Sequence, residues 1–173
     1  MTAGEAFTSI SGSGDDFAAI VALCEGLGDY CLIGGLAINA YVEPVYTMDA
    51  DFVLAAGQLA HARPALVAAG FTLEDFPHSL NALRPGSQLR IQFTRDPRYD
   101  AFPARSQRRD ILGRSLRVAS LPDLVQGKIW AWSDPARRLT KRKKDELDLL
   151  RIAEKFPEFL PQLPPPLREQ MGK

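Results

Sequence analysis

Two acidic residues separated by one position, Asp49 and Asp51, are the residues of this chain best suited to bind a metal ion. They lie in an apolar segment, residues 47–54, with the composition of a β-strand. Side chains two positions apart in a strand share a face, so both carboxylates leave one side while Ala50 and Phe52 face the other. Two carboxylates held this close are costly unless a cation lies between them. We therefore predict a site for Mg²⁺ or Mn²⁺ at Asp49 and Asp51.

A glycine pair, Gly34 and Gly35, follows a short apolar strand predicted over residues 30–33 and precedes a short helix predicted over residues 36–42. A strand that enters such a turn and then a helix leaves backbone N–H groups free, and these groups can bind phosphate. Phosphate groups beside a divalent metal make a site for a nucleoside triphosphate (NTP). We therefore predict that Gly34 and Gly35 contact the triphosphate of an NTP substrate.

A lysine, Lys128, interrupts the apolar stripe of a helix predicted over residues 121–133. A lysine in that position has to extend to solvent, lose its charge or find a carboxylate. One interpretation is that Lys128 snorkels or forms a structural ion pair. The other is that it reaches the phosphates or the acids of the active site.

Basic residues crowd the start of a second helix, predicted over residues 138–156. They are Arg137, Arg138, Lys141, Arg142, Lys143 and Lys144. If this helix begins near Thr140, the cations of its first turn oppose the helix dipole, which hints at a use for them. If it begins further upstream, Lys141 and Lys144 form ordinary pairs with the acids four positions later on a solvated face. The functional alternative is binding of the triphosphate or of an RNA backbone.

The remaining segments mix strands and helices, with helices at both ends of the chain. Helices are predicted over residues 15–27 and 58–69, strands over 71–74, 80–83 and 89–94, a helix over 99–109, and a hairpin of strands 110–112 and 116–118. This order predicts an α+β fold, a mixed β-sheet flanked by helices. We predict a flexible tail over residues 1–14, one domain over 15–158, and a Pro-rich tail over 159–173 that lies extended on the surface.

The composition limits the classes of function. The 173 residues carry a formal net charge of zero, so any attraction to RNA has to come from a local patch. Cys24 and Cys31 lie in apolar surroundings and indicate buried free thiols in a reducing compartment. The sequence contains neither an apolar run long enough to span a bilayer nor the basic start of a secretory signal. We therefore expect a cytoplasmic protein without a membrane partner.

The segment GGLAINAYVEPVYTMDADF resembles the nucleotidyltransferase superfamily, whose signature is Gly-Gly or Gly-Ser followed at a short distance by acid-x-acid between apolar residues. The spacer here is residues 36–48. The variant looks most like the small AbiEii-type, or type IV toxin-like, nucleotidyltransferases, in which GG-x-A precedes a Thr and then DxD. The resemblance extends into the C-terminal half and covers roughly residues 15–156.

The resemblance implies a nucleotidyltransferase-like sheet with C-terminal helices and roles for several distal residues. Lys128 matches the lysine of the pattern S-L-x-D-L-x-x-x-K and would act on the active-site phosphates. Lys144, Asp145 and Asp148 match a C-terminal K-D-x-x-D motif. Asp148 would then assist catalysis, and Lys144 and Asp145 would bind the nucleotide, while one of the two acids pairs with Lys128.

The activity that the resemblance implies is metal-dependent transfer of a nucleotide from an NTP to RNA, such as tRNA, or to a protein. A toxin-like role would add a separate antitoxin protein as a partner. The alternative is a catalytically degenerate module that binds nucleotide, RNA or a protein partner. Gln92 supports the alternative, because it is a neutral residue in the strand where active members often carry a third carboxylate. A third possibility is a module that binds only proteins.

Overall fold

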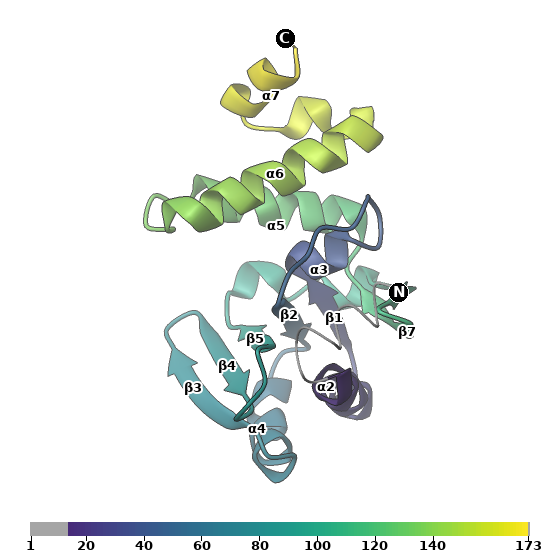
Figure 1. Ribbon diagram of the computed structural model, residues 1–173, viewed down its shortest axis with the longest axis vertical. Helices are drawn as coiled ribbons and strands as arrows, with labels where there is room; N and C mark the ends of the chain where they lie inside the picture. The colour runs from purple at the N-terminus through teal and green to yellow at the C-terminus, as the bar shows by residue number, and fades with distance from the viewer. Residues whose placement is uncertain (1–13, 173) are drawn as a thin grey trace.

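A seven-stranded mixed sheet, with the strand order β3-β4-β5-β2-β1-β7-β6, forms the centre of the protein (Figure 1). The computed structural model describes residues 14–172, so the tail predicted over residues 1–14 lies outside the described residues except for Gly14. The strands are β1 Tyr30–Ile33, β2 Asp49–Leu54, β3 Thr72–Phe76, β4 Ser79–Leu83, β5 Arg90–Thr94, β6 Gln107–Ile111 and β7 Arg114–Val118.

The strand that carries the two acids, β2, lies in the middle of this sheet. It pairs antiparallel with β1 and parallel with β5, and β1 in turn pairs parallel with β7. The hairpins β3–β4 and β6–β7 and the β4–β5 pair are antiparallel. The predicted mixed sheet is therefore confirmed, and both edges of the acid-bearing strand are covered by neighbours.

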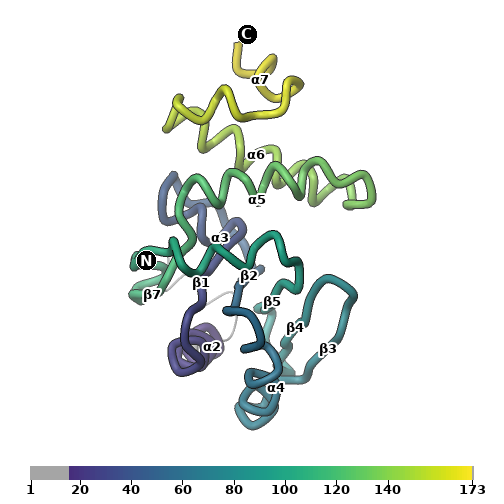
Figure 2. Tube along the Cα trace, turned by 180° about the vertical axis from the view of Figure 1, so that it is seen from behind, coloured from purple at the N-terminus to yellow at the C-terminus, as the bar shows by residue number. Residues whose placement is uncertain are grey.

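Helices cover the sheet on two sides. They are α2 Gly14–Leu27, α3 Gly34–Ile38, α4 Gln58–Ala68, α5 Leu121–Ser133, α6 Leu139–Lys155 and α7 Pro165–Met171. Helices α2 and α4 lie together on one side, and α5, α6 and α7 are stacked in succession on the other, with α3 between α5 and the strands (Figures 1 and 2). None of the helices within residues 14–172 combines the length and the apolar composition needed to cross a bilayer.

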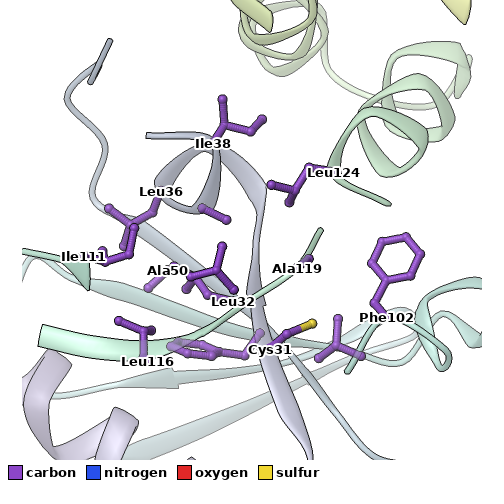
Figure 3. Close-up of a cluster of buried hydrophobic side chains, with 14 of the residues drawn as sticks. Cys31, Leu32, Leu36, Ile38, Ala50, Phe102, Ile111, Leu116, Ala119 and Leu124 are labelled. Atoms are coloured by element: carbon purple, nitrogen blue, oxygen red, sulfur yellow. The ribbon is translucent and has the colours of Figure 1, made fainter. Parts of the chain in front are cut away.

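The core explains why the two acids face the α5–α6 side. Phe52, on the opposite face of β2, is fully buried and packs against Phe17 of α2 and Phe93 of β5, with ring centroids 6.5 and 5.8 Å apart. Figure 3 shows another part of the core, to which Cys31 of β1 and Leu36 of α3 contribute. Since alternate residues of a strand face opposite ways, burial of Phe52 turns the acids toward α5 and α6.

Two predictions about secondary structure are wrong. Residues 99–109 do not form a helix but two 3₁₀ turns, Pro97–Tyr99 and Pro103–Arg105, followed by β6, because the prolines interrupt helical hydrogen bonding and residues 107–111 pair with β7 instead. Residues 159–172 do not lie extended, and Lys173 lies outside the described residues. A 3₁₀ helix, Pro157–Gln162, and α7 fold back onto α6.

Three buried apolar residues account for the packing of the C-terminal segment. Phe159 lies in the 3₁₀ helix, Leu163 in the extended link after it, and Leu167 in α7. Smaller differences concern boundaries: the helix expected over residues 36–42 is Gly34–Ile38, and the acid-bearing strand begins at Asp49. The predicted burial of Cys24 and Cys31 as free cysteines is confirmed.

Candidate functional site

A cavity of about 680 Å³ lies between the acid-bearing face of the sheet and helices α5 and α6. All the residues predicted for the site line it. They are Gly34, Gly35, Asp49, Asp51, Lys128, Lys144, Asp145 and Asp148. The structure therefore brings together residues that are up to 114 positions apart in the sequence.

The first acid, Asp49, is held by two cations. Lys141 Nζ of α6 donates to Asp49 Oδ2 at 2.7 Å, and Arg90 Nε of β5 lies 2.6 Å from Asp49 Oδ1. Burial raises the pKa of Asp49, but the hydrogen bond and charge of Lys141 and the charge of Arg90 outweigh it and hold the pKa below its usual value. Asp49 is therefore ionised at neutral pH.

The second acid, Asp51, is in the opposite situation. Within residues 14–172 its carboxylate makes no hydrogen bond or ion pair. Burial, and then the neighbouring charge of Asp49, raise the pKa of Asp51 to about 6. A half-buried carboxylate without a partner among these residues, beside a second carboxylate, is a group that a cation would stabilise.

We expect Asp51→Asn to stabilise the metal-free protein at neutral pH. Because the folded-state pKa is raised from 3.8 to about 6, the unfolded state loses its proton first, and the wild type loses stability as the pH rises through this range. Once Asp51 is fully ionised in the folded state, the free energy of unfolding of the wild type is lower by roughly 3 kcal/mol. Urea unfolding in EDTA should show a gain for the variant that is small near pH 4, rises between pH 4 and pH 6, and becomes constant above about pH 7. An equal gain at all pH values would contradict the raised pKa.

The glycine turn lies directly against this second acid. Gly34 has φ +75°, and a Cβ at this position would overlap Asp51 Oδ2 and lie 3.2 Å from Asp51 Cγ. Gly35 is close to a different acid, because a Cβ there would lie 3.6 Å from Asp148 Oδ2. Only glycine at position 34 allows the turn and the carboxylate to approach each other this closely.

We expect Gly34→Ala to destabilise the protein more than Gly57→Ala does. Both glycines have positive φ, +75° and +82°, so both variants carry the strain of a left-handed alanine, roughly 1–2 kcal/mol. Only Gly34 meets a neighbour, because nothing lies within 4 Å of a Cβ at Gly57. Urea unfolding of the two variants isolates the contact with Asp51. Equal losses would show that the turn does not press on this acid.

A buried ion-pair network joins α5 to α6 above the turn. Lys128 Nζ lies 2.9 Å from Asp145 Oδ1 and 2.7 Å from Asp148 Oδ2. Burial lowers the pKa of Lys128, but the two carboxylates outweigh it and raise the pKa above its usual value. Arg137 completes the pairing of Asp145, with Nε 2.5 Å from Oδ2. The structural ion pair is thus confirmed for Lys128, and its action on phosphates stays a prediction.

The start of α6 decides between the two interpretations of the basic run. The helix begins at Leu139, so Lys141 lies in its first turn and faces the helix dipole with its own positive charge. Lys141 binds Asp49 of β2, and the pair expected between it and the acid four positions later is wrong. Lys144 is exposed at the cavity and forms no ion pair within the described residues.

Sequence reasoning missed two of the arginines that complete the site. Arg90 lies opposite Asp49 in the β2–β5 register, a relation that appears only once the strands are paired. Arg151 Nη1 donates to Asp148 Oδ1 at 2.7 Å, and Arg151 Nη2 donates to Asn39 Oδ1 at 3.1 Å, which ties α6 to the segment after α3. The spacing of three between Asp148 and Arg151 was the available signal.

A third acid is not supplied by the neighbouring strand. Gln92 of β5 stands opposite Asp51 in the register, and Asp96, beyond the end of β5, is paired with Arg98 at 2.6 Å. Among the described residues, no group of three or more acidic, histidine or cysteine side chains is arranged to hold a metal. Asp49 and Asp51 nevertheless suit Mg²⁺, which is commonly bound through one or two carboxylates together with substrate phosphates.

The fold is similar to that of solved nucleotidyltransferases, although no protein family and no curated protein matches the chain by sequence. ANT(2'')-Ia, in complex with adenylyl-2''-tobramycin, matches at a TM-score of 0.59 and 15% identity over 90% of this chain and 96% of that one. The lincosamide antibiotic adenylyltransferase LnuA, with lincomycin bound, matches at 0.54 and 13% identity over 78% and 94% of the two chains. An antigenic nucleotidyltransferase-like protein from Paracoccidioides brasiliensis matches at 0.52 and 18% identity over 83% and 77%.

At these identities the likeness concerns the fold. It confirms the predicted α+β arrangement, a nucleotidyltransferase-like mixed sheet flanked by helices and followed by C-terminal helices. The narrower resemblance to AbiEii-type proteins stays a prediction.

Proposed function

We propose that the protein transfers a nucleotide from an NTP to an acceptor hydroxyl, using Mg²⁺ or Mn²⁺. The observation that carries the proposal is the place of Asp51. It is a half-buried carboxylate that makes no hydrogen bond or ion pair among residues 14–172, it lies beside a second carboxylate, and it is in contact with the Gly34 turn at a cavity of about 680 Å³. This is the combination of groups that a metal-bound triphosphate requires.

Asp49 and Asp51 would hold the metal. When bound, the metal neutralises charge on the triphosphate and helps to activate the attacking hydroxyl. Lys141 and Arg90 hold Asp49 by charge-assisted bonds, and Lys141 also lines the cavity that would hold the triphosphate. Lys144, which has no ion-pair partner among residues 14–172, adds a positive charge at the same cavity.

Other residues of the site would bind the phosphates or hold α6 in place. Gly34 and Gly35 bring backbone N–H groups to the phosphates. Asp145 and Asp148 of α6 pair with Lys128 of α5, and each also pairs with an arginine, Arg137 or Arg151. These ion pairs fix α6 over the site, so that Lys141 and Lys144 line the cavity. We propose Asp148 and Lys128 as assisting groups and Asp145 and Lys144 as nucleotide-side groups on the family resemblance alone.

The acceptor class is a separate part of the proposal. The resemblance implies RNA, such as tRNA, or a protein, with an antitoxin as partner and a cytoplasmic location. The structural neighbours act on, or are bound to, small hydroxylated antibiotics, namely tobramycin as its adenylyl derivative and lincomycin. Both classes offer a hydroxyl group to the same phosphorus atom.

Transfer from α-labelled NTPs tests the proposal. Each of the four NTPs is supplied with Mg²⁺ to the full chain, together with total RNA in one set of reactions and tobramycin or lincomycin in another. Label on an acceptor or on the protein itself, lost in the Asp49→Asn, Asp51→Asn double variant, supports the transferase. Absence of label from every NTP, in a protein shown to be folded, would contradict it.

The second candidate function is a degenerate module that binds nucleotide, RNA or a protein partner without chemistry. The observation in its favour is Gln92, a neutral side chain opposite Asp51 where a third carboxylate would complete the metal site. Salt-sensitive RNA binding or NTP binding without transfer would support this function. A module that binds only proteins would show neither.

A further inference from the structure

A row of polar side chains leads away from Asp51 across the sheet. In the strand registers Asp51 of β2 stands opposite Gln92 of β5, Gln92 opposite Asn81 of β4, and Asn81 opposite Glu74 of β3. Residues directly opposite each other on neighbouring strands share a face, so all four side chains project from the acid-bearing face. A second cavity, of about 270 Å³, is lined by these four residues.

The polar groups of this row are largely unused by the protein. Glu74 and Gln92 are exposed, and within residues 14–172 neither side chain makes a hydrogen bond or an ion pair. Asn81 accepts a hydrogen bond at Oδ1 from Ser79 Oγ at 3.2 Å, which leaves its amide N–H groups available. Carboxamides that line a cavity with free donors and acceptors are groups that can orient a ligand.

The row lies on the opposite flank of Asp51 from the glycine turn. Gly34 presses on Asp51 from the β1–α3 side, whereas Gln92, Asn81 and Glu74 extend on the β5–β3 side. If the triphosphate occupies the glycine side, as the proposed function requires, the row borders the side from which a hydroxyl approaches the phosphorus. This step rests on the proposed function.

We infer that Glu74, Asn81 and Gln92 form the acceptor subsite, and that the acceptor is a small hydroxylated amine. Its hydroxyl oxygen would attack the α-phosphorus near Asp51. A new P–O bond forms, the bond to the pyrophosphate breaks, and pyrophosphate leaves while the hydroxyl proton passes to solvent. The neutral amides would bind hydroxyl groups along the row, and Glu74 would bind an ammonium group at its far end.

The charges of the subsite favour a cation over a polyanion. Arg90 and Lys141 also border this cavity, but both are bound to Asp49, whereas Glu74 has no cationic partner among the described residues. An RNA strand would bring phosphates next to this unpaired carboxylate. Three strand spacings separate Glu74 from Asp51, roughly 14 Å, so the acceptor has to span about that length.

Calorimetric titration of tobramycin, a hydroxylated polyamine, into the full chain tests the inference. The titration is made with Mn²⁺ and a non-hydrolysable analogue of each NTP in turn, for wild type, Glu74→Gln and Glu154→Gln. Glu154 is exposed on α6 and borders neither cavity, so its variant has the same change in net charge. We expect Glu74→Gln to weaken tobramycin binding about fivefold or more, and Glu154→Gln to leave it unchanged.

The outcomes separate this inference from the proposed function. The subsite is supported if Glu74→Gln binds nucleotide as the wild type does but binds tobramycin more weakly, while Glu154→Gln binds both as the wild type does. Nucleotide binding without tobramycin binding, equal effects of the two variants, or transfer to tRNA that Glu74→Gln leaves unaffected would overturn the subsite but not the transferase. Absence of Mn²⁺-dependent binding for all four nucleotide analogues would overturn the proposed function and this inference with it.

Discussion

Replacing Asp51 by Asn is expected to lower the rate of nucleotide transfer on the order of a thousandfold or more. The substitution keeps the size of the side chain but removes the charge that would hold the metal, and several kcal/mol of transition-state stabilisation depend on that metal. Since the Asp51 carboxylate makes no ion pair or hydrogen bond within residues 14–172, and Asn has nearly the same size, the substitution breaks no polar interaction and keeps the contact with the Gly34 turn. The measurement is the initial rate of label transfer from the active NTP, at saturating Mg²⁺.

The matched control is Asp110→Asn. Asp110 is an exposed acid on β6, borders neither cavity, and changes the net charge by the same amount. Its variant should transfer at the wild-type rate. If Asp51→Asn is folded and keeps a rate close to that of this control, Asp51 does not hold the metal and the catalytic assignment is wrong.

Replacing Lys128 by Met is expected to lower the free energy of unfolding by about 3 kcal/mol, the lower end of the range for breaking a buried pair. The loss arises because Asp145 and Asp148 stay buried after their shared cation is removed. It is not larger, because Arg137 and Arg151 still pair with these two acids. Urea unfolding at neutral pH measures the change.

Lys143→Met provides the comparison from the same protein. Lys143 pairs with Glu146 at 3.2 Å, its side chain is 65% exposed, and such surface pairs contribute no more than about 1 kcal/mol. If Lys128→Met is no less stable than Lys143→Met but loses transfer, then Lys128 acts on the phosphates and not as the structural ion pair.

Local sequence patterns were sufficient for the parts of the site that depend on neighbours in the chain. The alternation around Asp49 and Asp51 depends only on the period of a strand, and the buried Phe52 on the opposite face is in agreement with it. The strand, glycine pair and short helix before them are also local features, and the structure places them as a turn against Asp51.

Local sequence patterns did not predict the contacts between segments that are distant in the chain. The K-D-x-x-D acids were recognised by resemblance, but the pairing of both with Lys128 required α5 to lie against α6. The C-terminal prolines suggested an extended tail, whereas burial of Phe159, Leu163 and Leu167 on α6 outweighed that local preference.

By itself, the sequence determined that two carboxylates share one face of a strand beside a Gly-Gly turn, because strand period and glycine geometry act over a few residues. Only the tertiary structure decided that Arg90 and Lys141 bind Asp49 while Asp51 is left without a partner among the described residues. Those pairings depend on strand register and helix packing. Both are determined by burial of the whole hydrophobic core, so they cannot be predicted from a short segment of sequence.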